Sequence, residues 1–414
     1  MERIEAELLI PGTGEPVRDG VVVVDGELIH YAGPAADAPV GDDEAVVRAP
    51  VVMPGLWDCH AHFLGISTLD LNLLALQPAP LRAARSTRDL QVALDAGVTS
   101  VREVGGLGVS LAQAVNEGTL SGPRIYPAGA VLSSTGGHAD LHSFPTAWIA
   151  DFGAHGGDLR VCDGVDDCVR AVREQLRRDA KVIKICASGG VMSEVDDPHH
   201  QLFTHRELAA IVETAALSER VVAAHCHGKA GILAALEAGA RTIEHGTYLD
   251  EECCAAMKET GAVLVPTRTV VEALHNTADL PPFALDKIRR VGEQHIQSVT
   301  LAHESGVTIA MGTDITLTAG SPLNSWGHNG AELAYLVDAG LSPLEAIRAA
   351  TVHGPDTLGP QAPHSGQLAA GYDADVITLD ANPLTDISVI ADPRNVSGVW
   401  VLGQRVKGMA DTAA

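Results

Sequence analysis

Two pairs of histidines in the sequence have a spacing that suits metal binding. His60 and His62 are separated by one residue, as are His225 and His227, and each pair follows a short apolar run. Side chains two residues apart on a strand point to the same face, so both imidazoles of a pair can reach one ion. Such pairs also occur incidentally in loops, so the prediction of a metal site requires further ligand residues nearby.

Further residues of ligand type stand in or directly after other apolar runs, namely Lys184, His245 and Asp314. The ends of parallel strands in an α/β barrel gather at one face, where the active sites of such barrels lie. Asp314 alone would more often be a helix cap or a turn residue. Together the set contains, in chain order, two histidines, one lysine, two further histidines and one aspartate. This joint pattern predicts one polar centre at the barrel mouth.

Lys184 lies inside the apolar run Lys181–Ala187. Burial of an ammonium group is costly and can lower a lysine pKa by several units. One interpretation is a lysine whose amine reaches the barrel rim and stays in water. The functional interpretation is a neutral amine that adds carbon dioxide and becomes a carbamate, which bridges two divalent metals. Lys181, on the opposite face of the strand, is expected to be an ordinary solvated lysine.

Short apolar runs alternate with helical patterns from about residue 51 onward. Two helix starts carry capping boxes, Thr204–Glu207 and Ser342–Glu345. Near-continuous apolar strands between helices are typical of a parallel sheet covered on both faces. No glycine-rich phosphate motif follows the first run, so the pattern favours an α/β fold of the distorted (β/α)8 TIM barrel type. The eight expected strands are Val51–Trp57, Val98–Val104, Ile125–Leu132, Lys181–Ala187, Arg220–Ala224, Arg241–Glu244, Ala262–Pro266 and Val307–Gly312.

Both ends of the chain have all-β patterns. Near the N-terminus, Gly20–Val24 and Glu27–Tyr31 flank an Asp-Gly turn, which predicts a hairpin. Near the C-terminus, Asp375–Leu379 and Val396–Leu402 have the composition of strands. We therefore expect a small β-sandwich built from residues 1–53 and 362–414, beside a barrel of residues 54–361.

The composition narrows the classes of partner and the compartment. With 28 basic and 53 acidic side chains, the 414 residues have a formal net charge of −25. Such a surface repels phosphates, so neither nucleic acid nor a membrane surface is an expected partner. The N-terminus lacks the profile of a signal peptide, and the seven cysteines include no CxxC pair. These features predict a cytoplasmic protein with reduced thiols.

The residues discussed so far lie in longer segments that resemble one family over nearly the whole chain. The sequence is similar to the amidohydrolase superfamily with a binuclear metal centre. Within it, the sequence resembles the branch of prolidases (Xaa-Pro dipeptidases) and imidazolonepropionases, which also includes ochratoxin-degrading amidohydrolases. The segments are Val52–His62, Thr99–Gly106, Ser134–Asp140, Ile183–Ser193, Thr242–Gly246, Gly312–Asp314 and Gly366–Val376.

The resemblance implies a role for each residue of the predicted centre. It makes His60, His62 and Asp314 ligands of one divalent ion, His225 and His245 ligands of the other, and carbamylated Lys184 the bridge. Zinc is the expected metal. The resemblance also implies a hydroxide between the two ions as the nucleophile. Asp314 would take its proton and return it to the leaving amine.

The sequence leaves more than one role open for several histidines and for Arg102. Geometry alone does not decide between His225 and His227 as ligand, whereas the resemblance favours His225 and leaves His227 for the substrate or a supporting role. His138 matches a family histidine that reaches the substrate, although it could be a polar loop residue. Weaker candidates are Arg102, His142, His199, His200 and His328, whereas His275, His295 and His303 are expected at the surface.

The reaction favoured by these residues is hydrolysis of an amide. A related deaminase would carry an acid where this chain has Gly228, so deamination is disfavoured. We expect release of a C-terminal amino acid from a small-molecule amide or peptide, such as an Xaa-Pro dipeptide, an N-acyl amino acid or an ochratoxin-like amide, by a homo-oligomeric enzyme. The substrate carboxylate would need donors such as His138, His227, Arg102 or Arg268. The alternatives are hydrolysis of a carbamate, urea, lactone or organophosphate, or an inactive scaffold.

Overall fold

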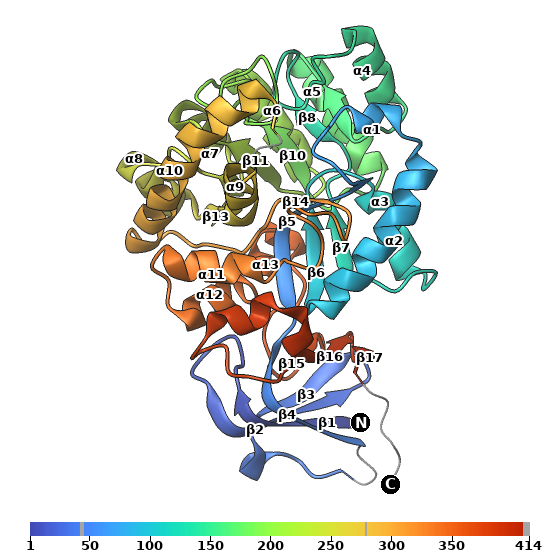
Figure 1. The fold of residues 1–414 in the computed structure, drawn as a ribbon, viewed down its shortest axis with the longest axis vertical. Helices are drawn as coiled ribbons and strands as arrows, with labels where there is room; N and C mark the ends of the chain where they lie inside the picture. Colours follow the sequence, from blue (N-terminus) through green and yellow to red (C-terminus); the bar gives the residue numbers. More distant parts are fainter. Residues whose placement is uncertain (42–44, 278–279, 409–414) are drawn as a thin grey trace.

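The computed structural model describes residues 1–41, 45–277 and 280–408, which form a large α/β body and a smaller sheet (Figure 1). Strands from both ends of the chain gather in the smaller sheet, at the end of the molecule where the N-terminus lies. The intervening chain forms parallel strands surrounded by helices. The expected α/β class is therefore confirmed.

The large body contains two parallel sheets. One has the strand order β13-β12-β11-β10-β8-β9, and the other has the order β14-β5-β6-β7. Every hydrogen-bonded pair in both sheets is parallel. The strands are β5 (Leu56–Ile66), β6 (Val98–Glu103), β7 (Arg124–Pro127), β8 (Val131–Ser133), β9 (Leu159–Val161), β10 (Ile183–Cys186), β11 (Val222–Cys226), β12 (Thr242–His245), β13 (Val263–Val265) and β14 (Ile315–Leu317).

Backbone hydrogen bonds link these two sheets. At one side, Ala310 N donates to Leu264 O at 2.9 Å, and Cys59 N donates to Met311 O at 2.8 Å. At the other side, Lys181 N donates to Pro127 O at 2.7 Å. The expected eighth strand, Val307–Gly312, therefore lies between β13 and β5 but forms only an isolated bridge at Ile309, and the assigned strand β14 begins later.

Two expected strands are divided in the structure. The run Val51–Trp57 contains the end of β4 (Ala45–Pro54), in the smaller sheet, and the start of β5. The chain crosses between the sheets at Gly55, where a Cβ atom would lie 2.2 Å from Thr99 Oγ1. The run Ile125–Leu132 forms β7 and β8, because Gly129 between them has a left-handed φ of +77°. Both breaks occur at glycines whose roles depend on tertiary contacts or backbone angle.

Helices cover the outside of the parallel strands, and both predicted capping boxes are present. The α-helices are α1 (Leu73–Leu76), α2 (Ala79–Asp95), α3 (Gly108–Asn116), α4 (Thr146–Ala154), α5 (Val165–Arg177), α6 (His205–Ala216), α7 (Lys229–Ala238), α8 (Glu251–Thr260), α9 (Arg268–His275), α10 (Pro282–Glu304), α11 (Ala331–Asp338), α12 (Pro343–Ala349) and α13 (His353–Asp356). Short 3-10 helices span Ala35–Asp37, Gly359–Gln361, Ile387–Ala391 and Pro393–Asn395. None of the helices described is long and apolar enough to span a membrane.

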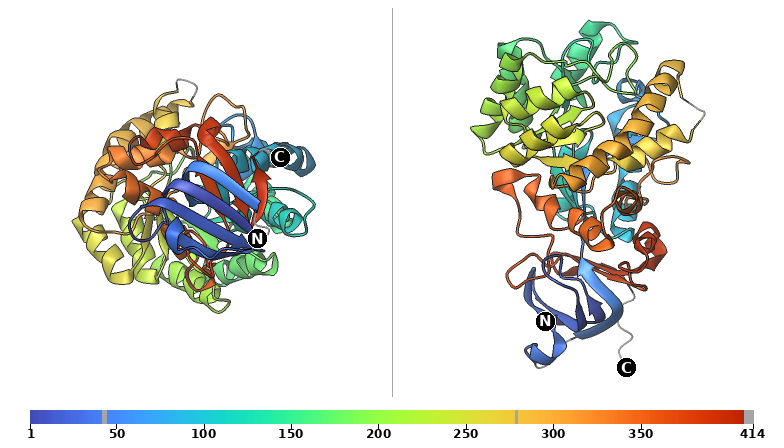
Figure 2. Two further views of the ribbon diagram at one scale, coloured as in Figure 1. Left: turned by 90° about the horizontal axis from the view of Figure 1, so that it is seen from below. Right: turned by 90° about the vertical axis from the view of Figure 1, so that its left-hand side faces the viewer.

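The strands from the two ends of the chain form one seven-stranded sheet, with the order β17-β16-β15-β4-β1-β2-β3 (Figure 2). The predicted hairpin is confirmed as β2 paired with β3. The topology differs from the predicted sandwich because β15 pairs directly with β4 and makes the sheet continuous. The remaining strands are β1 (Glu2–Leu9), β2 (Val17–Asp25), β3 (Leu28–Pro34), β15 (Val376–Leu379), β16 (Val396–Val401) and β17 (Gln404–Lys407).

Candidate metal centre

Six side chains of ligand type meet where the parallel strands end. His60 and His62 come from β5, and Asp314 immediately precedes β14. His225 lies in β11 and His245 ends β12, with His227 directly after β11. They form two groups, His60/His62/Asp314 and His225/His227/His245, and within each group the potential ligand atoms lie within 4.8 Å of one another. The structure thus brings together residues that are 254 positions apart in the chain.

The first group has an anionic member and fixed imidazole orientations. Asp314 Oδ1 lies 3.1 Å from His62 Nε2 and 3.6 Å from His60 Nε2. The Nδ1 atoms face away, His60 toward Glu244 Oε2 and His62 toward Gly105 O, each at 2.7 Å. Because these oxygens accept hydrogen bonds, each Nδ1 carries a proton, and each Nε2 is directed toward Asp314. Burial opposes ionisation of Asp314, but His60, His62 and Lys184 hold the pKa of its carboxyl below the ordinary value.

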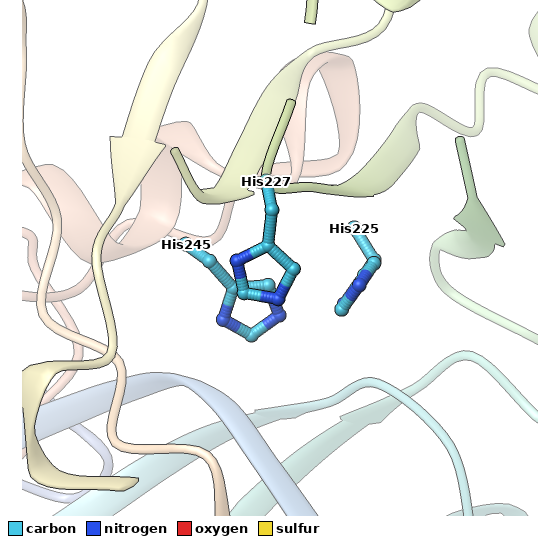
Figure 3. A group of neighbouring side chains, drawn as sticks. All are labelled: His225, His227 and His245. Atoms are coloured by element: carbon cyan, nitrogen blue, oxygen red, sulfur yellow. The ribbon is translucent and has the colours of Figure 1, made fainter. Parts of the chain in front are cut away.

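The second group consists of three neutral imidazoles that face a shared space (Figure 3). His227 Nδ1 and His245 Nδ1 each lie 2.7 Å from a threonine hydroxyl, of Thr247 and Thr267 respectively. His225 instead turns Nε2 toward Gly189 O at 3.3 Å, which leaves its Nδ1 available. Burial lowers the pKa of all three imidazoles well below the ordinary value, so they are neutral at pH 7 and able to bind a cation.

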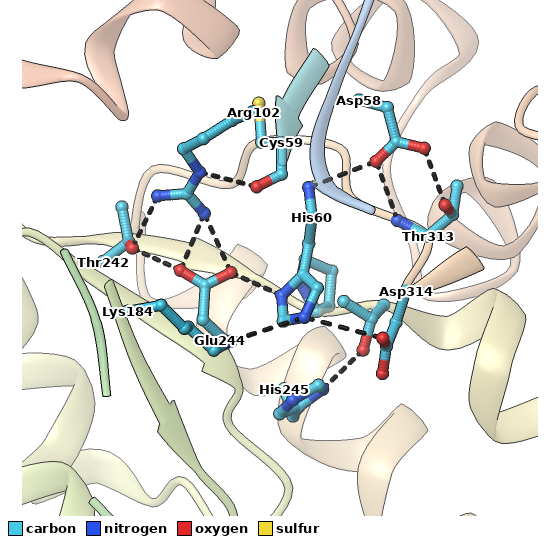
Figure 4. A network of polar contacts seen from close by, with 12 residues as sticks. Asp58, Cys59, His60, Arg102, Lys184, Thr242, Glu244, His245, Thr313 and Asp314 are labelled. Atoms are coloured by element: carbon cyan, nitrogen blue, oxygen red, sulfur yellow. Dashed lines mark hydrogen bonds and ion pairs between the residues drawn. The ribbon is translucent and has the colours of Figure 1, made fainter. Parts of the chain in front are cut away.

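Lys184 lies close to both groups, since its charge acts on histidines of each. It extends from β10, is 3% exposed, and places Nζ 3.4 Å from His60 Nε2 (Figure 4). Burial lowers the pKa of the Lys184 amine below the ordinary value, so the neutral form is more populated than in a solvated lysine. The neutral amine is the form that can take up carbon dioxide. The burial also contradicts the interpretation of Lys184 as a solvated rim residue.

A buried ion pair lies behind His60. The two carboxylate oxygens of Glu244 accept hydrogen bonds from Arg102 Nη2 at 2.7 and 2.8 Å, while Arg102 Nε donates to Cys59 O at 2.6 Å (Figure 4). Burial alone would raise the pKa of Glu244, but Arg102 and then His60 hold it far below the ordinary value. Glu244 was not among the residues predicted from the sequence, although an acid inside a buried strand was a visible signal. Arg102, predicted at the substrate, is instead fully buried behind the histidines and does not line the pocket.

A second buried carboxylate holds the backbone that carries the first group. Asp58 accepts hydrogen bonds from Thr313 Oγ1 at 2.6 Å and Asn329 Nδ2 at 2.7 Å, and from His60 N at 3.2 Å. The residue after Thr313, Asp314, has a left-handed φ of +52°, and His245 has a φ of +71°. Such angles are uncommon for residues other than glycine and cluster at functional sites. Thus two of the predicted ligands are held in unusual backbone conformations.

Both groups line a hollow with aliphatic walls that encloses about 160 Å³ of free space. His138 lines it, and its ring stacks on His225 with centroids 4.3 Å apart. Arg268 does not line the hollow, because it binds Glu272 and the carbonyl of Gly292. The apolar lining residues are Leu64, Leu69, Leu71, Leu74, Val131, Ala139, Leu159, Val191, Met192, Val270, Val271, Leu274, Ile288 and Val291.

The remaining histidines lie outside this hollow. His142 accepts a hydrogen bond from Val195 N at 3.3 Å and lines a neighbouring depression, and the His199 ring lies tilted against the ring of Tyr248. His200 is exposed, and His328 contacts Ser325. The prediction that His295 lies at the surface is wrong, because it is on the inner face of α10, where Nε2 donates to Pro266 O at 2.7 Å. His275 is exposed and His303 is half-buried.

Comparisons with known proteins agree with this architecture. Residues 51–406 match the model of the amidohydrolase family. The chain is 43% identical to ochratoxinase from Aspergillus niger, an alignment that covers 98% of this chain and 86% of the relative. The crystal structure of A. niger ochratoxinase superposes with a TM-score of 0.91, covering 98% of this chain and 95% of that one.

Two solved dipeptidases are also similar. A prolidase in complex with N-methylphosphonate-L-proline is 35% identical with a TM-score of 0.89, and the match covers 99% of this chain and 100% of that one. An Xaa-Pro dipeptidase with bound methionine is 32% identical with a TM-score of 0.88, and the match covers 98% and 100% of the two chains.

Proposed function

The chain belongs to the amidohydrolase family and is a hydrolytic enzyme, and we propose that it cleaves the amide bond that precedes a C-terminal amino acid. The observation that carries this proposal is the pair of ligand groups with the buried Lys184 close to them. Five imidazoles and a carboxylate, all within one hollow, form a donor set that suits two divalent ions, with zinc as our choice.

The proposed ligand assignment follows the hydrogen bonds. His60, His62 and Asp314 would hold one ion through two Nε2 atoms and a carboxylate oxygen. His245 and His225 would hold the other, with His225 using the Nδ1 that its contact with Gly189 leaves available. A carbamate on Lys184 would bridge the two and supply an anion to the all-neutral second group.

When bound, the two ions would acidify a water molecule and polarise a substrate carbonyl. Asp314 is the base in this proposal, because its carboxylate is ionised and lies beside both imidazoles of the first group. It would take a proton and return it to the leaving amine. The aliphatic walls exclude water from the substrate and favour an apolar group next to the scissile bond.

Recognition of the substrate carboxylate is assigned to His138 and His227. Among the described residues that line the hollow, Lys184 is the one lysine or arginine, and it belongs to the metal centre. Burial lowers the pKa of His138 and His227, so both are neutral hydrogen-bond donors rather than cations. This differs from the sequence prediction, in which Arg102 or Arg268 shared that task.

The similar proteins support the choice of substrate class. One is named ochratoxinase, one is a prolidase in complex with a proline phosphonate, and one is an Xaa-Pro dipeptidase with bound methionine. We propose that this chain likewise acts on an ochratoxin-like amide, an N-acyl amino acid or an Xaa-Pro dipeptide.

We also propose that the two linked parallel sheets act as one distorted (β/α)8 barrel. Residues 54–361 would be the catalytic domain, and residues 1–53 with 362–414 would form the second domain. A cytoplasmic location and a homo-oligomeric state remain predictions from the sequence.

The test compares substrates with a free carboxylate and with the same carboxylate amidated, in the metal-loaded enzyme. Loss of one hydrogen bond to a buried donor costs about 1–3 kcal/mol, so kcat/KM should fall by roughly ten- to a hundredfold for the amide. His138→Ala should reduce this ratio, because one of the two donors is removed. Equal kcat/KM values in the wild type would contradict the proposal and would indicate a substrate without that carboxylate, such as a carbamate or urea.

A further inference from the structure

Lys287 is a buried lysine that the proposed reaction does not use. It lies on α10, is 6% exposed, and points toward the loop between β10 and α6. Its Nζ donates to Gly190 O at 3.0 Å, Ser193 O at 2.6 Å and the backbone oxygen of Asp196, and it lies 3.4 Å from Asp196 Oδ1. One ammonium group therefore connects three positions of a loop to a long helix.

The same loop contacts His138. Ser193 Oγ lies 2.8 Å from His138 Nδ1, and Asp196 Oδ2 lies 3.9 Å from that nitrogen. Asp196 Oδ2 also accepts a hydrogen bond from Gly190 N at 2.8 Å. Gly190 packs so closely that a Cβ atom there would lie 2.2 Å from the His138 ring. The loop thus determines both the position of the ring and the partner of Nδ1.

Burial of the Lys287 ammonium group costs free energy, which its contacts with the loop must offset. An unpaired buried ammonium is strongly unfavourable, and even a buried ion pair contributes little net stability. Here the ammonium is satisfied by three carbonyl oxygens and one carboxylate, all from a segment whose ladder pairing is limited to the Ser188–Gln201 bridge. The contacts therefore determine the conformation of a loop that lacks other regular structure.

We infer that Lys287 is a positioning residue that acts through Asp196 and Ser193 to hold His138 in the orientation that contacts the substrate. This inference rests on the proposed function, in which His138 recognises the substrate carboxylate. With Nδ1 engaged by Ser193 and one ring face stacked on His225, Nε2 is the atom of His138 left for substrate. Lys287 itself does not line the hollow, so its effect passes through the loop.

The test measures kcat/KM for a free-acid substrate and its amide in the metal-loaded wild type, Lys287→Met, Ser193→Ala, His138→Ala and the double variant His138→Ala/Lys287→Met. Lys287→Met and Ser193→Ala should lower kcat/KM for the free acid about tenfold and change the value for the amide less than about threefold. In the His138→Ala background, Lys287→Met should add less than about threefold, because residues that act through one another are not additive. Metal content should match that of the wild type in each variant.

A merely structural role of Lys287 would give a different result. It would lower the values for both substrates together, and the losses of the two single variants would multiply in the double variant; either outcome would overturn the inference. Lys181→Met is the matched control, since Lys181 precedes the start of β10 and forms an ion pair with Asp179 at 2.7 Å; this variant should retain wild-type values. If Lys287→Met does not fold, Lys287→Gln takes its place, because the shorter amide loses most of the contacts with Gly190, Ser193 and Asp196 but keeps a polar group on α10; wild-type values for both substrates in Lys287→Gln would overturn the inference.

A crystal structure of Ser193→Ala or Lys287→Met separates this inference from the proposed function. Displacement of the His138 ring from its position on His225 would support the inference even if the wild type hydrolysed no amide, a result that would refute only the proposed function. An unmoved His138 ring in both variants would overturn the inference.

Discussion

The two ligand groups of the metal centre differ in what stands behind their histidines. In the first group, His60 is held by the ion pair of Glu244 and Arg102, and the group contains the ionised Asp314. In the second group, His245 and His227 are held by threonine hydroxyls, and every member is a neutral imidazole. One group therefore has charged support, whereas the other has only neutral hydrogen bonds.

This difference indicates what each group requires to bind a divalent ion. A carboxylate ligand offsets part of the ionic charge, and a carboxylate behind a histidine increases its basicity as a ligand. The second group has neither, so it depends on an anion supplied from elsewhere. In the proposed function, a carbamate on Lys184 supplies that anion. We therefore expect the ion in the second group to be lost first.

The largest effect that tests this comparison is expected from Lys184→Ala. The change removes the bridging anion, so activity should be abolished and metal content should fall from two ions toward one, measured by elemental analysis. Short carboxylic acids should restore part of the activity, because they replace the missing anion. Two ions and wild-type turnover in Lys184→Ala would contradict the binuclear assignment.

The next effect concerns the two neighbouring histidines of the second group. His225→Asn should lose one ion, whereas His227→Asn should keep both and mainly raise KM or lower kcat by about tenfold, as expected for the loss of a substrate contact. Metal content and kinetic constants measured on the same preparations distinguish the two. Loss of metal only in His227→Asn would reassign the ligand and free His225 for another role.

The smallest expected effect compares the ion pair behind His60 with the neutral hydrogen bond between Thr267 and His245. Glu244→Gln leaves the buried Arg102 without its counter-ion, so the free energy of unfolding should fall by about 3–5 kcal/mol. Thr267→Val, which removes one neutral hydrogen bond to His245, should cost about 1 kcal/mol. Chemical denaturation measures both values, and Thr378→Val, in the distant sheet, is a control for removal of a buried hydroxyl. If Glu244→Gln and Thr267→Val lowered the free energy of unfolding equally, the charge behind His60 would contribute no more stability than a neutral hydrogen bond.

Much of the centre was visible in the sequence because strand geometry is local. Residues two apart on a strand share a face, and the ends of parallel strands meet, so local patterns alone predicted that His60, His62, Lys184, His245 and Asp314 lie in one place. The α/β class, the N-terminal hairpin and the two capping boxes were predictable for the same reason, since each depends on residues close in the chain.

Other features depended on contacts between distant segments. The sequence suggests Arg102 as a hydrogen-bond donor to the substrate. Its partner is instead Glu244, 142 residues away, and this ion pair holds the Arg102 side chain behind the histidines. His295 occupies the inner face of α10, where the packing of that helix against the strand end at Pro266 determines its burial. The single seven-stranded sheet likewise follows from the pairing of β15 with β4, which unites the two ends of the chain.

The sequence by itself thus determined which side chains could bind metal and near which strand ends they stand, because periodicity and strand direction are properties of short segments. Only the tertiary structure decided which polar groups support each ligand, and with what charge. The ion pair behind His60, the threonines behind His227 and His245, and the loop that Lys287 holds around His138 join segments that local patterns cannot relate. The physical reason is that burial and pairing, which determine ionisation and orientation, arise only when these segments pack together.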